Sequence, residues 1–315
     1  MIYLESGNIR LGILEDAGGR IVSLQKEGGR NLLKSDATLW NQEKPLPSPA
    51  NLDFTGYNGH EVWAGPQSEW WKHQDLNQEK KASTLFWPPD PYITYGRYKV
   101  TRQSVNSITL EGENSPISGL KLTKQYVITS EGTVEISVEA ENIRKKDISW
   151  DLWMLTRVDG NNPTFVPIES GKNIKVTEPT HEWEGSAPYQ YGYGYFTFTP
   201  ERRDMRKEAC TAKAFLTPNE PFIATLSQGK LLVLRFEHHA QDKLHPEQTE
   251  VELYNYASAD DSCLMEMEYH APYMTLKPGE KMSTKETWQI YDYTGKTDRE
   301  SLCKYLDAYI KIKDK

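Results

Sequence analysis

Two carboxylates stand two residues apart in a segment that alternates apolar and polar residues, Cys263–Tyr269. On a β-strand such neighbours point to the same side, so Glu266 and Glu268 are expected to share one face. Met265 and Met267 then point into the core. Like charges on one face repel each other, which raises the pKa of one carboxyl group toward neutrality and suits it to act as a general base. The alternative is a solvated face on which both glutamates do no chemistry.

The proton donor that would complement this base is a candidate histidine, His60. It lies in a segment rich in glycine and aromatic residues, Asn58–Gln67, which is expected to edge the same pocket as Glu268. An imidazole titrates near neutrality and could therefore supply the acid. A hydrogen-bonded loop histidine without a catalytic role is the alternative interpretation.

A second group of titratable residues surrounds His239, which shares a strand side with Glu237. His238 and His239 are adjacent, so on a strand they point to opposite faces and cannot bind one metal ion together. Glu237, His239 and His245 could supply metal ligands, but nothing in their spacing requires a metal. The sequence contains no glycine-rich phosphate loop and no nucleotide fingerprint, so we predict neither a metal nor a cofactor.

Aromatic residues are abundant for a polar chain. The sequence has 9 Trp, 18 Tyr and 8 Phe, although only 37% of its residues are hydrophobic. An aromatic face packs flat against the C–H face of a pyranose ring, so tryptophans in Gly/Pro loops predict a sugar-stacking surface. Packing under a loop is the alternative for each tryptophan taken singly. The loop-associated tryptophans are Trp63, Trp70, Trp71, Trp87, Trp150, Trp153 and Trp183.

Most of the chain alternates with a period of two residues, which is typical of half-buried strands. Asp16–Gly19 and Thr129–Gly132 each separate two such segments and are predicted to be hairpin turns. Only Thr297–Ile312 has the apolar spacing of an amphipathic helix. Further strands are expected at Ile148–Thr156, Tyr191–Phe198, Phe222–Leu226, Leu231–Phe236, Val251–Tyr254, Cys263–Tyr269 and Lys285–Tyr291.

This density of strands predicts an all-β sandwich. No linker divides the chain, so we expect one β-sandwich domain over residues 1–292, followed by a C-terminal helical appendage over residues 293–315.

The composition argues against several classes of protein. The chain has 315 residues and a net charge of −8, which argues against a nucleic-acid or anionic-membrane partner. No run approaches the roughly 18 apolar residues of a membrane span. Three cysteines, Cys210, Cys263 and Cys303, form neither a disulfide framework nor a zinc signature. The first residues do not read as a secretory leader, so a cytoplasmic location is expected, or a periplasmic one if a leader has been removed.

Several short motifs resemble galactose mutarotase-like (aldose 1-epimerase-like) proteins. Near the start they are Gly18–Leu24 (GGRIVSL) and Gly28–Leu33 (GGRNLL), and near the end Leu276–Glu280 (LKPGE). Trp153–Val158 and Val251–Asn255 also fit, and together the motifs span most of residues 1–291. The resemblance implies a β-supersandwich, with a short C-terminal helix here, whose concave face holds a carbohydrate.

The resemblance also implies catalytic roles. In that family a glutamate on the penultimate strand is the base and a histidine on the middle strand is the acid. Glu268 matches the position of the base slightly better than Glu266. The middle strand here, Trp150–Arg157, contains no histidine, so the chain resembles a less-characterised branch that lacks the usual acid, and His60 is the candidate substitute.

The polar groups expected to contact a sugar follow in part from the same resemblance, since Arg157, Lys213 and Glu252 stand at positions that the branch uses. Arginine and lysine beside one sugar favour an anionic one, such as a uronate or a sugar phosphate. The predicted sugar contacts are Trp63, Trp153, Arg157, Lys213, His239, Glu252 and Glu266.

Three functions fit these residues, each with a small carbohydrate as the partner. The first is an aldose 1-epimerase-like isomerase that uses Glu268 as base and His60 as acid. The second is a non-catalytic carbohydrate-binding protein, because a fold does not fix a function. The third is a lyase or glycosidase, which needs a second carboxyl group at a defined distance from Glu268.

Overall fold

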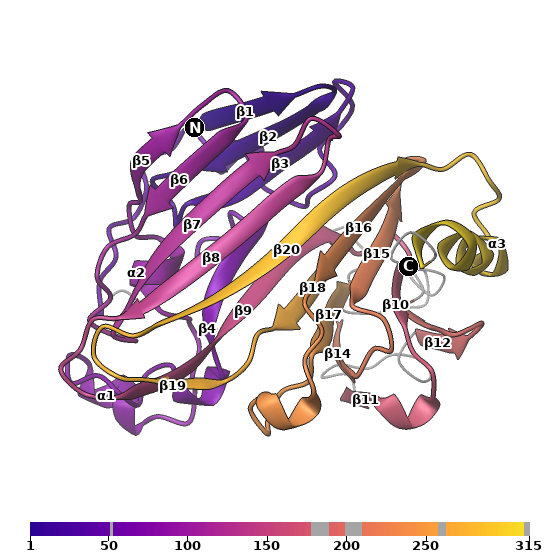
Figure 1. The fold of residues 1–315 in the computed structure, drawn as a ribbon. Coiled ribbons are helices and arrows are strands. Elements are labelled where there is room, and N and C mark those ends of the chain that lie inside the picture. Colours follow the sequence, from indigo (N-terminus) through magenta and orange to yellow (C-terminus); the bar gives the residue numbers. More distant parts are fainter. Residues whose placement is uncertain (51–52, 178–188, 199–209, 258–262, 312–315) are drawn as a thin grey trace.

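The computed structural model describes residues 1–50, 53–177, 189–198, 210–257 and 263–311. Two antiparallel sheets of ten strands each pack face to face, with the C-terminal helix beside one end of the second sheet (Figure 1). The predicted all-β sandwich is therefore confirmed.

The first sheet joins strands from both halves of the chain. Its order is β1(Ile2–Ser6), β2(Ile9–Leu14), β3(Arg20–Lys26), β4(His60–Gly65), β9(Ile148–Asp159), β18(Leu264–His270), β17(Val251–Ala257), β14(Cys210–Leu216) and β11(Ile174–Thr177), and β19(Met274–Leu276) pairs with β9. The second sheet has the order β12(Tyr189–Gly192), β13(Tyr195–Phe198), β10(Thr164–Pro167), β15(Phe222–Ser227), β16(Lys230–Phe236), β20(Lys281–Asp292), β8(Val134–Asn142), β7(Leu120–Ile128), β6(Ser107–Glu111) and β5(Lys99–Gln103).

Helices are short. They are α1(Gln78–Ala82), α2(Pro91–Thr94) and α3(Arg299–Tyr305), with a π-helical turn at Leu306–Ile310 and 3₁₀ turns at Ala37–Leu39, Gln67–Glu69, Gly171–Asn173 and Gln241–Lys243. In the described part of the chain, no helix combines the length and the apolar character that crossing a bilayer requires.

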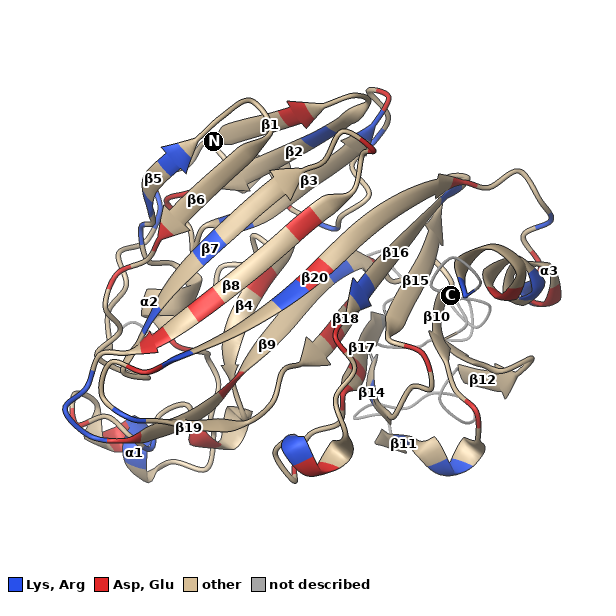
Figure 2. Ribbon diagram, viewed as in Figure 1, with Lys and Arg blue, Asp and Glu red and all other residues tan. Residues whose placement is uncertain are grey.

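The second sheet turns a charged face to solvent. Figure 2 shows positive and negative positions along β7, β8 and β20. On β8, Glu135 is exposed and Glu139 half-buried, whereas Ile136 and Val138 are buried. Lys281 of β20 lies 2.8 Å from Glu139 across the strand pair. The two-residue period that predicts the strands is thus the period that separates core from solvent.

The predicted strand Tyr191–Phe198 is instead a hairpin. It is split into β12 and β13 by Tyr193 and Gly194, whose φ angles are 53° and 77°. Two consecutive left-handed residues form the tight turn that matches the twist of paired strands. Alternating tyrosines concealed this turn, because they continue the period-two pattern through it.

The C-terminal helix begins at Arg299, two residues later than expected. Asp298 caps it, because its side chain accepts a hydrogen bond from the Ser301 N–H. Helical structure continues to Ile310, and residue 312 lies outside the described chain. Leu302 and other apolar residues of this segment pack against the second sheet.

The core between the sheets contains a polar cluster around Glu286. His60 Nδ1 lies 3.4 Å from Glu286 Oε1 and 2.9 Å from Thr156 Oγ1. The indole N–H of Trp288 donates to Glu286 Oε1 over 3.0 Å. Burial raises the pKa of Glu286 to about 8, so its carboxyl group is largely protonated in the folded protein at neutral pH.

Replacing this carboxyl group should flatten the pH dependence of stability. At pH values between 4.5, its unfolded pKa, and about 8, its folded pKa, Glu286 is protonated to a greater extent in the folded state than in the unfolded state. Its contribution to the free energy of unfolding therefore falls as pH rises, by up to about 1.4 kcal/mol per pH unit. Glu286→Gln should remove this slope in urea unfolding series, whereas Glu135→Gln on the exposed side of β8 should not. Parallel slopes for wild type and Glu286→Gln would show that Glu286 is ionised in the folded protein.

Candidate functional site

The candidate site lies on the outer face of the first sheet, meaning the face that points away from the second sheet. On β18, Met265 and Met267 are buried in the core between the sheets, and the Tyr269 ring stacks on Phe236 of the second sheet. Glu266 and Glu268 therefore point to the outer face, as their spacing predicts. This orientation brings them beside residues of β9, β17 and β14.

Glu268 is the centre of a buried polar cluster. Its side chain is fully buried, and Oε2 accepts hydrogen bonds from the Trp153 indole N–H at 2.9 Å and from Lys213 Nζ at 3.0 Å. Oε1 is buried and has no hydrogen-bond partner among the described residues. Burial raises the pKa of Glu268 to about 8, against the opposing effect of Lys213 and with the help of the Glu266 and Glu252 charges.

Lys213 links this carboxyl group to a second one. Its Nζ lies 2.7 Å from Glu252 Oε2 as well as 3.0 Å from Glu268 Oε2, and 4.8 Å from the centre of the Trp153 ring. Register explains the contact, because Glu252 of β17 stands directly opposite Glu268 of β18, and β14 is the next strand. Burial lowers the pKa of Lys213, but the two carboxylates raise it more, so the ammonium is held charged.

His270 completes the cluster and was missed by the sequence reasoning. Its Nε2 lies 3.4 Å from Glu252 Oε1, and its Nδ1 lies 2.8 Å from the Gln248 amide and 3.6 Å from Asp151 Oδ1. Burial lowers the pKa of His270, but Glu252 and Asp151 raise it to about 9. The two-residue alternation could have identified it, because His270 follows Glu266 and Glu268 at the same spacing. It was missed because the predicted strand ended at residue 269.

The same charges act on Glu252. Burial raises its pKa, but His270 and Lys213 lower it to about 2, so Glu252 is ionised while Glu268 is largely protonated at neutral pH. Glu252, Glu268 and His270 each offer a ligand atom, and these atoms lie within 4.8 Å of one another. The geometry could hold a divalent ion, although the ammonium of Lys213 already contacts both carboxyl groups and offsets the charge of Glu252.

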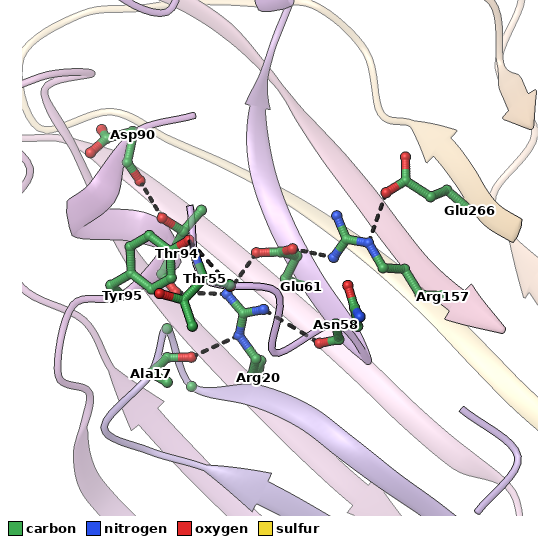
Figure 3. Close-up of polar contacts among 12 residues, drawn as sticks. Ala17, Arg20, Thr55, Asn58, Glu61, Asp90, Thr94, Tyr95, Arg157 and Glu266 are labelled. Carbon is green, nitrogen blue, oxygen red and sulfur yellow. Dashed lines mark hydrogen bonds and ion pairs between the residues drawn. The ribbon is translucent and has the colours of Figure 1, made fainter. Parts of the chain in front are cut away.

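Arg157 belongs to a separate, linear network of charges on the same face (Figure 3). Arg20 Nη2 lies 2.8 Å from Glu61 Oε2, the other oxygen of Glu61 bonds Arg157 Nη1, and Arg157 Nε lies 2.7 Å from Glu266 Oε1. Arg20, Glu61 and Arg157 are each at most 2% exposed. Arg157 is therefore bound by two carboxylates, and Glu266 pairs with it instead of with Glu268.

The tryptophans form a buried cluster more than a surface. The Trp63 ring lies 5.1 Å from Trp153, 5.4 Å from Trp70 and 5.9 Å from Trp87, with edge-to-face geometry. Trp63, Trp70 and Trp153 are at most 4% exposed, whereas Trp87 is 43% exposed. The prediction of a chiefly sugar-stacking surface is corrected accordingly, because most of these rings are buried and pack against one another. Trp183 lies outside the described residues.

A cavity of about 170 Å³ lies beside the cluster. Trp153, Lys213 and Glu252 form its inner wall, and Phe215 offers an aromatic side chain. A cavity of about 150 Å³ is enough to hold benzene, so this one accepts a single ring-sized molecule. The remaining lining residues are Pro66, Gln67, Glu247 and Gln248.

Two predicted site residues lie elsewhere. His60 begins β4 and faces the core between the sheets, whereas its neighbour Glu61 faces the candidate site, because adjacent strand residues point to opposite sides. Burial lowers the pKa of His60 well below its usual range, so it is neutral there. His239 follows β16 in a loop and not on a strand, and its backbone N–H donates to the Glu250 carboxylate.

The solved structures with a similar fold include galactose mutarotase-like proteins. One from Lactobacillus casei ATCC 334 is 14% identical and matches over 92% of this chain and 100% of its own, with a TM-score of 0.55. One from Clostridium acetobutylicum is 14% identical over 92% and 94% of the two chains, with a TM-score of 0.55. A galactose 1-epimerase from Lactobacillus acidophilus NCFM is 14% identical over 92% and 94%, with a TM-score of 0.52.

These similarities show the fold, and they confirm the predicted galactose mutarotase-like architecture. No curated protein matches the sequence. The match to a family model covers nearly the whole β-sandwich, and the chain belongs to that family, described as domain of unknown function DUF4380, over residues 1–291.

Proposed function

We propose that the cavity beside Lys213 binds one ring of a carbohydrate, and that Glu268 and Lys213 interconvert its anomers. The observation that carries this proposal is the buried Glu268, whose pKa is about 8 and whose Oε2 lies 3.0 Å from Nζ of Lys213, a residue that lines the cavity. The penultimate-strand position of Glu268 and the fold shared with a galactose 1-epimerase support the reaction class.

Anomer interconversion needs a base at the anomeric hydroxyl and an acid at the ring oxygen. In this proposal ionised Glu268 removes the hydroxyl proton, and the Lys213 ammonium protonates the ring oxygen as the C1–O5 bond breaks. The open aldehyde then turns about its C1–C2 bond and the steps reverse. Protonation of Glu268 removes one of the two negative charges that hold the Lys213 proton, so the pKa of Lys213 falls when it must donate.

A sugar hydroxyl needs a free acceptor on Glu268, and Oε1 is buried without a partner in the described part of the chain. Lys213 contacts both the cavity and Glu268, with 22% of its side chain exposed. Its flexible four-carbon stem can turn aside to admit the hydroxyl and remain close to the ring oxygen. Trp153 keeps its hydrogen bond to Oε2 and holds the carboxyl group in place.

The charge balance of the site favours a neutral sugar over the anionic one expected from the sequence. Arg157 is paired with Glu61 and Glu266, and Lys213 with Glu252 and Glu268. Neither cation has charge to spare for a carboxylate or phosphate.

Non-catalytic carbohydrate binding is the second candidate, and one observation favours it. Both hydrogen bonds to Glu268 Oε2 come from residues that line the cavity, Trp153 and Lys213, so a sugar could bind to these two residues without reaching the carboxyl group.

Exchange NMR on neutral hexoses and their uronates separates the candidates. We expect the protein to accelerate anomer exchange of at least one neutral hexose over buffer, and the same sugar to shift the Trp153 indole N–H resonance. A shift without acceleration would support the binding protein and refute the enzyme. No shift with any sugar would refute both.

A further inference from the structure

A second and larger cavity lies on the second sheet, whereas the Glu268 cluster lies on the first. Its volume is about 410 Å³, within the range of roughly 300–1,000 Å³ typical of small-molecule sites. Phe165 of β10 and Leu226 of β15 face it from the sheet, and Leu302 faces it from α3. The other lining residues are Pro163, Thr197, Phe198, Gln228, Gly229, Thr297 and Arg299.

The C-terminal helix closes this cavity. Leu302 and Arg299 belong to α3, which lies beyond residues 1–291, so the family match does not account for the site. Figure 1 shows α3 beside the end of the second sheet that carries β10 and β12, and β13 lies between these two strands. Phe165, Leu226 and Leu302 belong to one apolar cluster, which gives the cavity walls that favour an apolar ligand.

Two polar groups in this wall have no partner in the described chain. Thr197 is 2% exposed, and its hydroxyl oxygen Oγ1 makes no hydrogen bond there. Arg299 Nε is also buried without an acceptor. An unpaired buried polar group is unfavourable, so two of them lining one cavity indicate a ligand that pairs with both.

Arg299 offers charge as well as a donor. Its Nη2 donates to the backbone oxygens of Gly192 at 2.9 Å and Tyr195 at 2.8 Å, which holds the guanidinium in place. No carboxylate pairs with Arg299 among the described residues, in contrast to Arg157 and Arg20. A fixed cation without a counter-ion beside a hydroxyl donor is suited to a carboxylate.

We propose that this cavity binds a small apolar carboxylate of the arylalkanoate type. The Arg299 Nε–H and the Thr197 O–H donate to its carboxylate, and its apolar part lies among Phe165, Leu226 and Leu302. This cavity shares no lining residue with the carbohydrate cavity, so a test of this proposal does not depend on the proposed anomer interconversion.

The probe is 3-phenylpropionate, titrated into the full-length protein by calorimetry, with 3-phenyl-1-propanol as its uncharged analogue. We expect the carboxylate to bind at least about tenfold more tightly than the alcohol, because hydrogen bonds to charged groups are the stronger ones. No binding of 3-phenylpropionate up to its solubility limit would overturn the proposal, and so would equal binding of the alcohol.

Two variants locate the binding. Thr197→Val should weaken 3-phenylpropionate binding about tenfold without destabilising the free protein, because it replaces an unpaired hydroxyl with a methyl group of the same shape. Arg299→Gln should abolish the preference for the carboxylate over the alcohol. Because Arg299 also supports the Gly192 and Tyr195 carbonyls, Thr197→Val remains decisive if Arg299→Gln does not fold.

The matched control is Thr164→Val on neighbouring β10. Thr164 is equally buried, its hydroxyl already donates to Thr225 Oγ1, and it does not line the cavity. Binding should be unchanged in this variant. Unchanged binding in Thr197→Val as well would place the ligand elsewhere and overturn the proposal.

Discussion

Glu268→Gln is expected to lower the rate of enzyme-catalysed anomer interconversion by roughly 10²- to 10⁴-fold, the usual contribution of a positioned general base. The amide cannot accept the hydroxyl proton, but it has the size of the carboxyl group and can still accept the Trp153 hydrogen bond. Sugar binding, followed by the Trp153 indole resonance, should therefore persist. Exchange NMR on the hexose that responds to the wild type gives the rate.

The pH profile provides a second readout of the same residue. A base acts in its ionised form, and burial holds the pKa of Glu268 at about 8. The wild-type kcat/KM should therefore rise with pH and level off above about pH 8. The residual rate of Glu268→Gln should lack this inflection.

Glu286→Gln is the matched control, because Glu286 is another buried carboxyl group whose pKa burial raises to about 8, but it faces the core between the sheets. It should keep wild-type activity and the wild-type pH profile. Equal losses in both variants would mean that the effect comes from removing a buried carboxyl group in general, and full activity of Glu268→Gln would exclude Glu268 as the base.

Glu61→Ala is expected to destabilise the protein by about 3–5 kcal/mol, because it leaves two buried arginines without their shared carboxylate. Arg20 is 0% and Arg157 2% exposed, and Glu61 bonds both of them (Figure 3). Arg157 keeps Glu266, so the larger part of the loss comes from Arg20. Urea unfolding measures the change.

An exposed ion pair supplies the comparison. Glu139→Ala removes the nearer of two acidic partners of Lys281, and the side chains of Glu139 and Lys281 are 42% and 49% exposed. Such a pair contributes less than about 1 kcal/mol, so this variant should remain near wild type. A loss of similar size in the two variants would contradict the assigned role of burial. If Glu61→Ala does not fold, Glu61→Gln tests the same missing charge with the side-chain volume kept.

Local pattern predicts a large part of the fold. The turns at Asp16–Gly19 and Thr129–Gly132 join β2 to β3 and β7 to β8, as expected, and both contain glycines with positive φ. The alternation of Met265 to Tyr269 correctly assigns the core and outer sides of β18. These features depend on a few neighbouring residues, which the sequence shows directly.

The contacts between the candidate residues could not be predicted from local pattern. Lys213, Glu252 and Glu268 meet because β14, β17 and β18 are neighbours in the first sheet. The carboxyl groups around Lys213 and Arg157 offset the charges of these two cations, and this pairing is the reason that we propose a neutral sugar where the sequence predicts an anionic one. Pairing between distant strands follows from the packing of the whole sandwich and leaves no local signature.

The sequence by itself determined many of the strands, the shared face of Glu266 and Glu268, and the resemblance to galactose mutarotase-like proteins. Only the tertiary structure decided that His60 faces the core and that His270 and Lys213 surround Glu268. It also decided that most of the tryptophans are buried. The physical reason is that side-chain direction along a strand repeats every two residues, whereas burial, pairing and pKa depend on which strands lie alongside.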